Sequence, residues 1–88
     1  MPIITSAKKR MRQNVLLRSR NRARRSTMRS AIKSFLQAVD SGDAQAANSQ
    51  WPDTQAIIDR TARFGVIHPN TAARTKSRLS RRLQQLSS

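Results

Sequence analysis

Apolar residues recur at intervals of three and four in the first half of the chain, which is the spacing of one side of an α-helix. A helix with such a stripe turns that side towards a core. The sequence therefore predicts a core-facing helix whose apolar positions are Met28, Ile32, Phe35, Leu36 and Val39.

The same helix is expected to extend far towards the N-terminus. Between Ile3 and Ser41 the chain contains no Pro or Gly, and most of its residues there are adequate helix formers. Thr5 or Ser6 is expected to cap its start, after a short extended lead over residues 1–4.

A turn is predicted where the sequence reads Asp40-Ser41-Gly42-Asp43. Gly42 suits the left-handed position that commonly follows a helix. Asp43 suits the N-cap of the next helix, where a side-chain oxygen accepts a free backbone N–H. A second helix is therefore expected at about residues 44–64.

Pro52 falls inside that second helix, where a proline removes one backbone hydrogen bond and costs about 3 kcal/mol. The helix either kinks at Pro52 or ends near Ser49 and restarts. The kink is favoured because the apolar side keeps its phase on both sides of the proline. The residues of that side are Ala47, Trp51, Ile58 and Ala62.

Gly65 is expected to close the second helix, and Val66 and Ile67 to pack beneath the end of the bundle. His68 or Asn70 is the expected cap of a third helix at about residues 71–86. Its predicted buried side consists of Ala72, Leu79, Leu83 and Leu86.

The predicted fold class is therefore all-α: a three-helix up-down bundle with a long, strongly basic first helix that extends beyond the core. The 88 residues are enough for one domain. Residues 1–27 form a basic arm within the first helix, and residues 28–86 form the three-helix core.

Charge is concentrated in the stretch from residue 8 to residue 33, which holds eleven Lys or Arg residues and no acid. The whole chain has a net charge of +14 and an isoelectric point of about 12.0. Like charges four residues apart on a helix destabilise it by roughly 0.2–0.5 kcal/mol per pair. Since nothing inside the stretch neutralises its charge, we expect a polyanion outside the protein to do so.

Helical geometry arranges many of these cations in stripes. At 100° per residue, one stripe about 80° wide runs along the first helix. We call it the first stripe, and it consists of Arg18, Arg22, Arg25, Arg29 and Lys33. A second stripe lies on the third helix opposite the predicted buried side, and consists of Arg74, Arg78, Arg81 and Arg82.

Folded RNA is the polyanion that these residues favour. Arg outnumbers Lys by fourteen to four, and guanidinium groups bind phosphate with two hydrogen bonds and stack on bases. Lys9, Arg20 and Arg24 lie outside the first stripe, which indicates a partner on more than one side of the helix. The arm is expected to be largely disordered without RNA, because it has few contacts to offset its ordering entropy.

The sequence contains few side chains that could catalyse a reaction. It contains four Asp, one His, no Glu, no Cys and no Tyr, and its two glycines cannot form a Gly-rich phosphate loop. We therefore expect no catalytic residues, no metal site and no cofactor. A lone His68 cannot supply the several ligands that a metal ion needs.

Three other functions compete with RNA binding. A DNA-compacting nucleoid protein would need the same positive charge. A cationic helix on a membrane surface would need a larger apolar side than the arm offers. Cleavage of residues 1–33 as a transit peptide would leave the remaining helices without their partner.

Three segments resemble the bacterial small-subunit ribosomal protein S20 family. They read SAKKRMRQN at residues 6–14, FLQAVDSGD at residues 35–43 and GVIHPNTAARTKSRL at residues 65–79. The resemblance covers essentially the whole chain in order, at the family's usual length, which argues against a transit peptide. The chain departs from the family pattern at Pro69, where a Lys is usual, and at Trp51-Pro52.

This resemblance implies a cytoplasmic, ribosome-bound protein that binds 16S ribosomal RNA in the 30S subunit and assists its folding and assembly. It implies few or no protein contacts, no membrane association and no small-molecule substrate. The family's N-terminal motif corresponds to Lys8, Lys9, Arg10, Arg12 and Asn14. Its second motif corresponds to His68, Asn70, Arg74, Lys76, Ser77 and Arg78.

Overall fold

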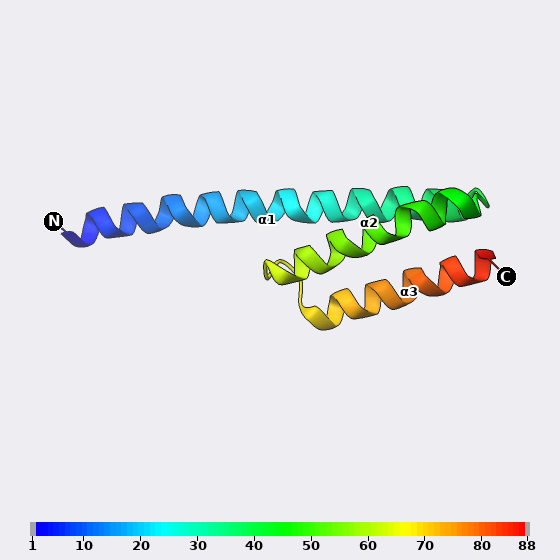
Figure 1. Ribbon diagram of the computed structural model, residues 1–88. Coiled ribbons are helices and arrows are strands. Elements are labelled where there is room, and N and C mark those ends of the chain that lie inside the picture. The colour runs from blue at the N-terminus through cyan, green and yellow to red at the C-terminus, as the bar shows by residue number, and fades with distance from the viewer. Residues whose placement is uncertain (1, 88) are drawn as a thin grey trace.

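The computed structural model describes residues 2–87 and consists of three helices joined by two tight turns (Figure 1). Helix α1 spans Pro2–Asp40, α2 spans Ala44–Arg63 and α3 spans Pro69–Ser87. Helices α1 and α3 run in the same direction and α2 runs against them, which confirms the predicted all-α, up-down arrangement.

The start of α1 differs from the prediction. The helix already includes residues 2–4, so the extended lead and the cap at Thr5 or Ser6 were wrong, and Met1 lies outside the described residues. Pro2 fits this start because the first helical position needs no backbone N–H donor and its fixed φ is already helical.

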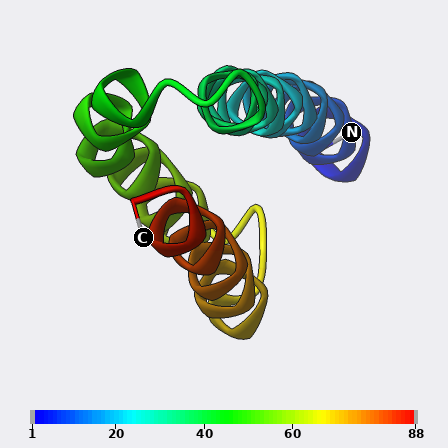
Figure 2. The same cartoon turned by 90° about the vertical axis from the view of Figure 1, so that its right-hand side faces the viewer.

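The bundle is open rather than closed. Helix α2 packs against both other helices, whereas α1 and α3 contact each other much less (Figure 2). The N-terminal half of α1 extends beyond the other two helices, and the molecule measures 66 Å along its longest axis. The basic arm is therefore a helical rod attached to a small core.

The core is centred on Phe35 of α1 and Ile58 of α2, which are both fully buried. Phe35 also packs on the half-buried Trp51, with the ring centroids 5.1 Å apart. The predicted buried positions of α3 contribute Leu79 and Leu83, and Leu86 packs against them at the edge.

Some core positions were not predicted. Ala38, Thr54 and Thr61 are buried as well. The two threonines tolerate burial because each hydroxyl donates to a carbonyl one turn earlier, at 3.0 Å to Gln50 and 2.7 Å to Ile57. A hydroxyl that is satisfied within its own helix costs little to remove from water.

Both helix ends at the turns follow their local chemistry. Gly42 and Gly65 adopt positive φ of 77° and 76°, in the left-handed region where glycine is unstrained. Asp43 caps α2, since its Oδ1 accepts the Ala46 N–H at 3.0 Å. These three predictions are confirmed.

Pro52 lies inside α2, and the helix continues through it. The alternative in which the second helix ends near Ser49 and restarts is therefore wrong. Pro52 itself is exposed, so its missing N–H lies on the side of α2 away from the core.

Candidate nucleic-acid interface

The first stripe lies on α1 and is called the α1 stripe from here on. It is fully exposed to solvent. Every one of its five cations is exposed, and neither ion pair formed within residues 2–87 involves any of them. A hollow of about 550 Å³ lies along the stripe. The hollow is lined by Arg22, Arg25, Ser26, Arg29, Ser30 and Lys33.

The composition of this hollow suits an anion. Small serine side chains lie between long cationic ones, so an oxygen-rich group can approach the helix and meet hydroxyl as well as guanidinium donors. No carboxylate is among the lining residues, which leaves four positive charges to attract a phosphate from outside.

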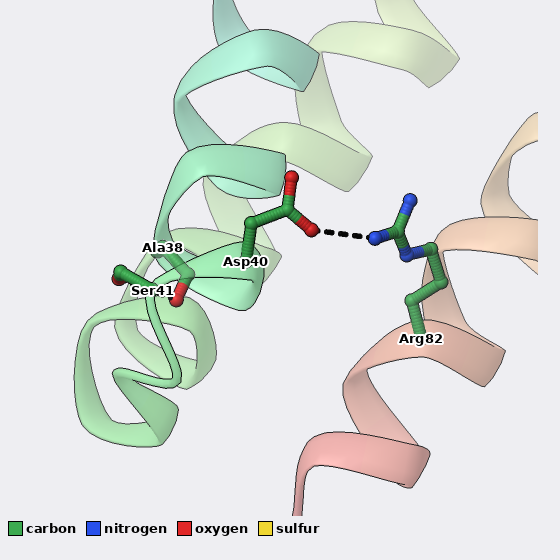
Figure 3. A network of polar contacts seen from close by, with 4 residues as sticks. All are labelled: Ala38, Asp40, Ser41 and Arg82. Carbon is green, nitrogen blue, oxygen red and sulfur yellow. Dashed lines mark hydrogen bonds and ion pairs between the residues drawn. The ribbon is translucent and has the colours of Figure 1, made fainter.

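The α1 stripe and the second stripe border the same side of the molecule. Asp40 follows Lys33 by seven residues, about two helical turns, and so projects from α1 in nearly the same direction. It pairs with Arg82 of α3, with Oδ1 and Nη2 2.6 Å apart (Figure 3). Arg74, Arg78 and Arg81 are exposed as well. At 100° per residue, Arg78 projects about 40° from Arg82, and Arg74 and Arg81 project about 80–100° from it.

The ion pair between Asp40 and Arg82 is weak enough for a phosphate to replace Asp40 as the partner of Arg82. The side chains are 65% and 47% exposed respectively, and an ion pair in such surroundings contributes about 0–1 kcal/mol. A phosphate can therefore compete for Arg82 without a large loss of stability in the bundle.

Lys76, by contrast, lies against α2. Its Nζ is 2.7 Å from Oδ1 of Asp59, and the Lys76 side chain is 33% exposed. This predicted RNA-binding residue thus makes an ion pair across α2 and α3 and stands apart from the second stripe. The neighbouring Ser77 is exposed.

His68 and Asn70 form the start of α3. Nδ1 of His68 accepts the backbone N–H of Asn70 at 3.0 Å, and the His68 carbonyl accepts the Ala72 N–H at 3.1 Å. Of the two predicted caps, His68 is therefore the one used. Pro69 follows at the first helical position, which needs no N–H donor.

The N-terminal motif is not brought near these residues. Lys8, Lys9, Arg10, Arg12 and Asn14 are all exposed on the free part of α1. With a rise of 1.5 Å per residue, Lys8 lies about 38 Å along the helix from Lys33. The predicted site residues thus form an elongated surface and not a single pocket.

Arg20 and Arg24 lie on a different side of α1 from the α1 stripe. Arg20 is exposed, whereas Arg24 is half-buried and its guanidinium carbon lies 3.7 Å from the ring centroid of Phe64. Sequence reasoning did not identify Phe64 as part of a site. The signal for it was an aromatic residue at a helix end, next to Gly65 and outside the apolar stripe of α2.

Other kinds of site are missing from the described part of the chain. Across residues 2–87, no three potential metal-ligating side chains come together. Within the same residues, no helix is long and apolar enough to cross a membrane.

Comparisons with a family model and with individual known proteins point to the same family. The family model for ribosomal protein S20 matches residues 2–84. The chain is 49% identical over 86 residues to the small ribosomal subunit protein bS20 of Legionella pneumophila, covering 98% of each chain. It is 45% identical to the bS20 protein of Stenotrophomonas maltophilia and 43% identical to that of Xanthomonas campestris, covering 98% of this chain and 97% of each relative.

Proposed function

The chain belongs to the ribosomal protein S20 family, and on this premise we propose that it binds 16S ribosomal RNA directly and stabilises the folded RNA during assembly. Membership itself makes the protein a structural constituent of the small ribosomal subunit and not an enzyme. It acts in the cytoplasm as part of the ribosome. Few or no contacts with other proteins are expected.

The observation that carries this proposal is the uncompensated α1 stripe. Its cations are exposed and have no carboxylate partner among the described residues, and the hollow between them is lined by hydroxyl and cationic groups alone. Phosphate oxygens are the acceptors that such a surface fits best. The stripe extends along a helix, as the phosphates extend along an RNA backbone.

The second stripe adds a separate set of contacts on α3. In this proposal the α1 stripe follows one RNA backbone while Arg74, Arg78, Arg81 and Arg82 hold a second segment. The core fixes the angle between the two helices, so both segments are held in one arrangement. Stabilising a fold of RNA requires this kind of simultaneous contact with segments that would otherwise repel each other.

Charge reversal tests the proposal. The variant carrying Arg22→Glu, Arg25→Glu and Arg29→Glu should lose binding to a 16S ribosomal RNA fragment in a filter-binding assay. Its helicity by circular dichroism should change little, because all three side chains are exposed. The matched variant with Lys at the same three positions keeps the charge and should keep most of the affinity.

The salt dependence of the affinity for RNA gives a quantitative check on the number of phosphates that the protein neutralises. A protein that neutralises six to ten phosphates loses about 10³- to 10⁵-fold in affinity between 50 and 200 mM salt.

Unchanged binding by the Glu variant would refute the proposal. Equal binding to random duplex DNA at about 0.2 M salt would favour a DNA-compacting protein instead.

A further inference from the structure

We propose that the hollow between α1 and α2 next to Phe64 binds one unpaired nucleotide of the RNA, with its base stacked against the Arg24–Phe64 pair. The inference rests on the proposed function, because it assigns a second and different contact with the same partner. The hollow has a volume of about 240 Å³. Its lining includes Ala23, Arg24 and Thr27 from α1, Ile57 and Arg60 from α2, and Phe64, which directly follows α2.

Phe64 is an aromatic ring kept at the surface. It is 51% exposed, although the other two aromatic residues of the chain, Phe35 and Trp51, pack on each other in the core. The end of α2 does not require an aromatic there, because Gly65 supplies the left-handed turn. An exposed ring next to cations is what stacking on a nucleobase requires.

Arg24 presents a guanidinium group that is already held in place. It lies over the Phe64 ring at 3.7 Å, and its Nη1 donates to Oδ1 of Asn21 at 3.5 Å. Arg24 is half-buried, whereas Arg22 and Arg25 beside it are exposed. A planar group fixed in this way loses little further entropy when a flat base stacks on it.

The remaining groups around the hollow suit the two parts of a nucleotide. Ala23 and Ile57 offer an apolar floor for the base. Arg60 lines the hollow one turn before Phe64, and Arg20 lies outside the lining, one turn before Arg24. Both are exposed, and the ion pairs of the described chain involve neither of them. A phosphate is therefore the expected neighbour of these cations, and an acidic peptide would leave the stacking surface unused.

This site lies on the α2 side of α1, whereas the α1 stripe lies on the α3 side. RNA bound at both would hold the α1 helix from two directions. Proteins commonly recognise RNA by stacking bases that have left a helix, and stacking on an uncharged base releases no counterions. The nucleotide site thus adds an interaction that the basic stripes cannot supply.

The first test compares two substitutions of Phe64 in the full-length chain. Phe64→Leu keeps an apolar side chain but removes the aromatic face, and stacking on one base is worth 1–3 kcal/mol. We expect affinity for the 16S ribosomal RNA fragment to fall about 5- to 150-fold, with the same slope of log affinity against log salt, because no cation is removed. Phe64→Trp should bind like the wild type. A Phe64→Leu variant that binds within twofold of wild type would overturn the inference.

The second test uses the wild-type protein and does not depend on how a variant folds. RNA containing 4-thiouridine is irradiated in the complex, and the protein is digested with trypsin, which cuts after Arg63 and Arg74. Peptide 64–74 should be crosslinked to a nucleotide outside the RNA helices. Crosslinks confined to residues 8–22, 30–33 and 75–87, which do not line the hollow, would overturn the nucleotide site while leaving the proposed function intact. Failure of the wild type to bind the RNA at all would instead refute the proposed function.

Discussion

Replacing Phe35 by Ala should remove most of the stability of the bundle. Phe35 is fully buried and stacks on Trp51, and it belongs to the cluster that joins all three helices. Truncating a buried Phe to Ala typically costs 3–5 kcal/mol, because the lost burial is accompanied by a cavity. The site is central in this fold, so little of the cavity can be closed by a shift of the surface.

The magnitude is large in comparison with the whole fold. Only about 60 residues, from the region of Arg24 to the end of α3, share the packed core. At 0.05–0.15 kcal/mol per residue, such a unit has a free energy of unfolding of about 3–9 kcal/mol. At the middle of both ranges, the Phe35→Ala variant should keep a free energy of unfolding of only about 2 kcal/mol, whereas Phe35→Leu keeps part of the volume and should lose about 1–2 kcal/mol.

Urea unfolding provides the assay, because Trp51 is the only tryptophan and lies in contact with the substituted ring. Circular dichroism should be followed in parallel, since the substitution also changes the surroundings of Trp51 in the folded state. Ser34→Ala is the matched control on the same helix: its hydroxyl makes one exposed hydrogen bond, 3.0 Å from Oε1 of Gln50, and its loss should cost less than about 0.5 kcal/mol. A Phe35→Ala variant that is as stable as this control would refute the view that Phe35 holds the bundle together.

Two further predictions concern the helices on either side of this core. In hydrogen exchange of the free protein, the amides of residues 6–20 should exchange with solvent far faster than those of residues 28–39, because no side chain from residue 6 to residue 20 is buried. RNA should slow the exchange of these amides, and strong protection without RNA would contradict the prediction. Pro52→Ala should raise the free energy of unfolding by up to about 3 kcal/mol, because it restores a helical N–H at an exposed position of α2; a loss of stability in urea would mean that the proline shapes the core.

The turns and the core stripes could be predicted because their causes are local. Gly42, Asp43 and Gly65 act through their own backbone angles or through a cap three residues away. The apolar positions of α1 and α3 follow the helical period, and that period fixes which side is buried. Such signals need no knowledge of the tertiary arrangement.

The features that the sequence did not reveal depend on partners far along the chain or on hydroxyl chemistry. The pairs Asp40–Arg82 and Arg24–Phe64 each join residues about 40 positions apart, so neither is visible as a spacing pattern. Thr54 and Thr61 read as polar, and only their bonds to their own helix make burial acceptable. The predicted start of α1 is too late because Thr5 and Ser6 both suit a cap, whereas the helix already begins at Pro2, which suits a first helical position.

The structure separates two tasks that have opposite electrostatic requirements. A core needs helices that attract each other, and α2 serves this purpose with few cations, an Asp cap and an ion pair to α3. Binding RNA needs cations without internal partners, which weakens the helix that carries them by roughly 0.2–0.5 kcal/mol for each like-charged i,i+4 pair. Helix α1 meets both requirements by packing only its C-terminal half. Its N-terminal half keeps unbalanced charge, so under the proposed function RNA would supply part of the free energy that stabilises it, and formation of a rigid arm would be coupled to assembly.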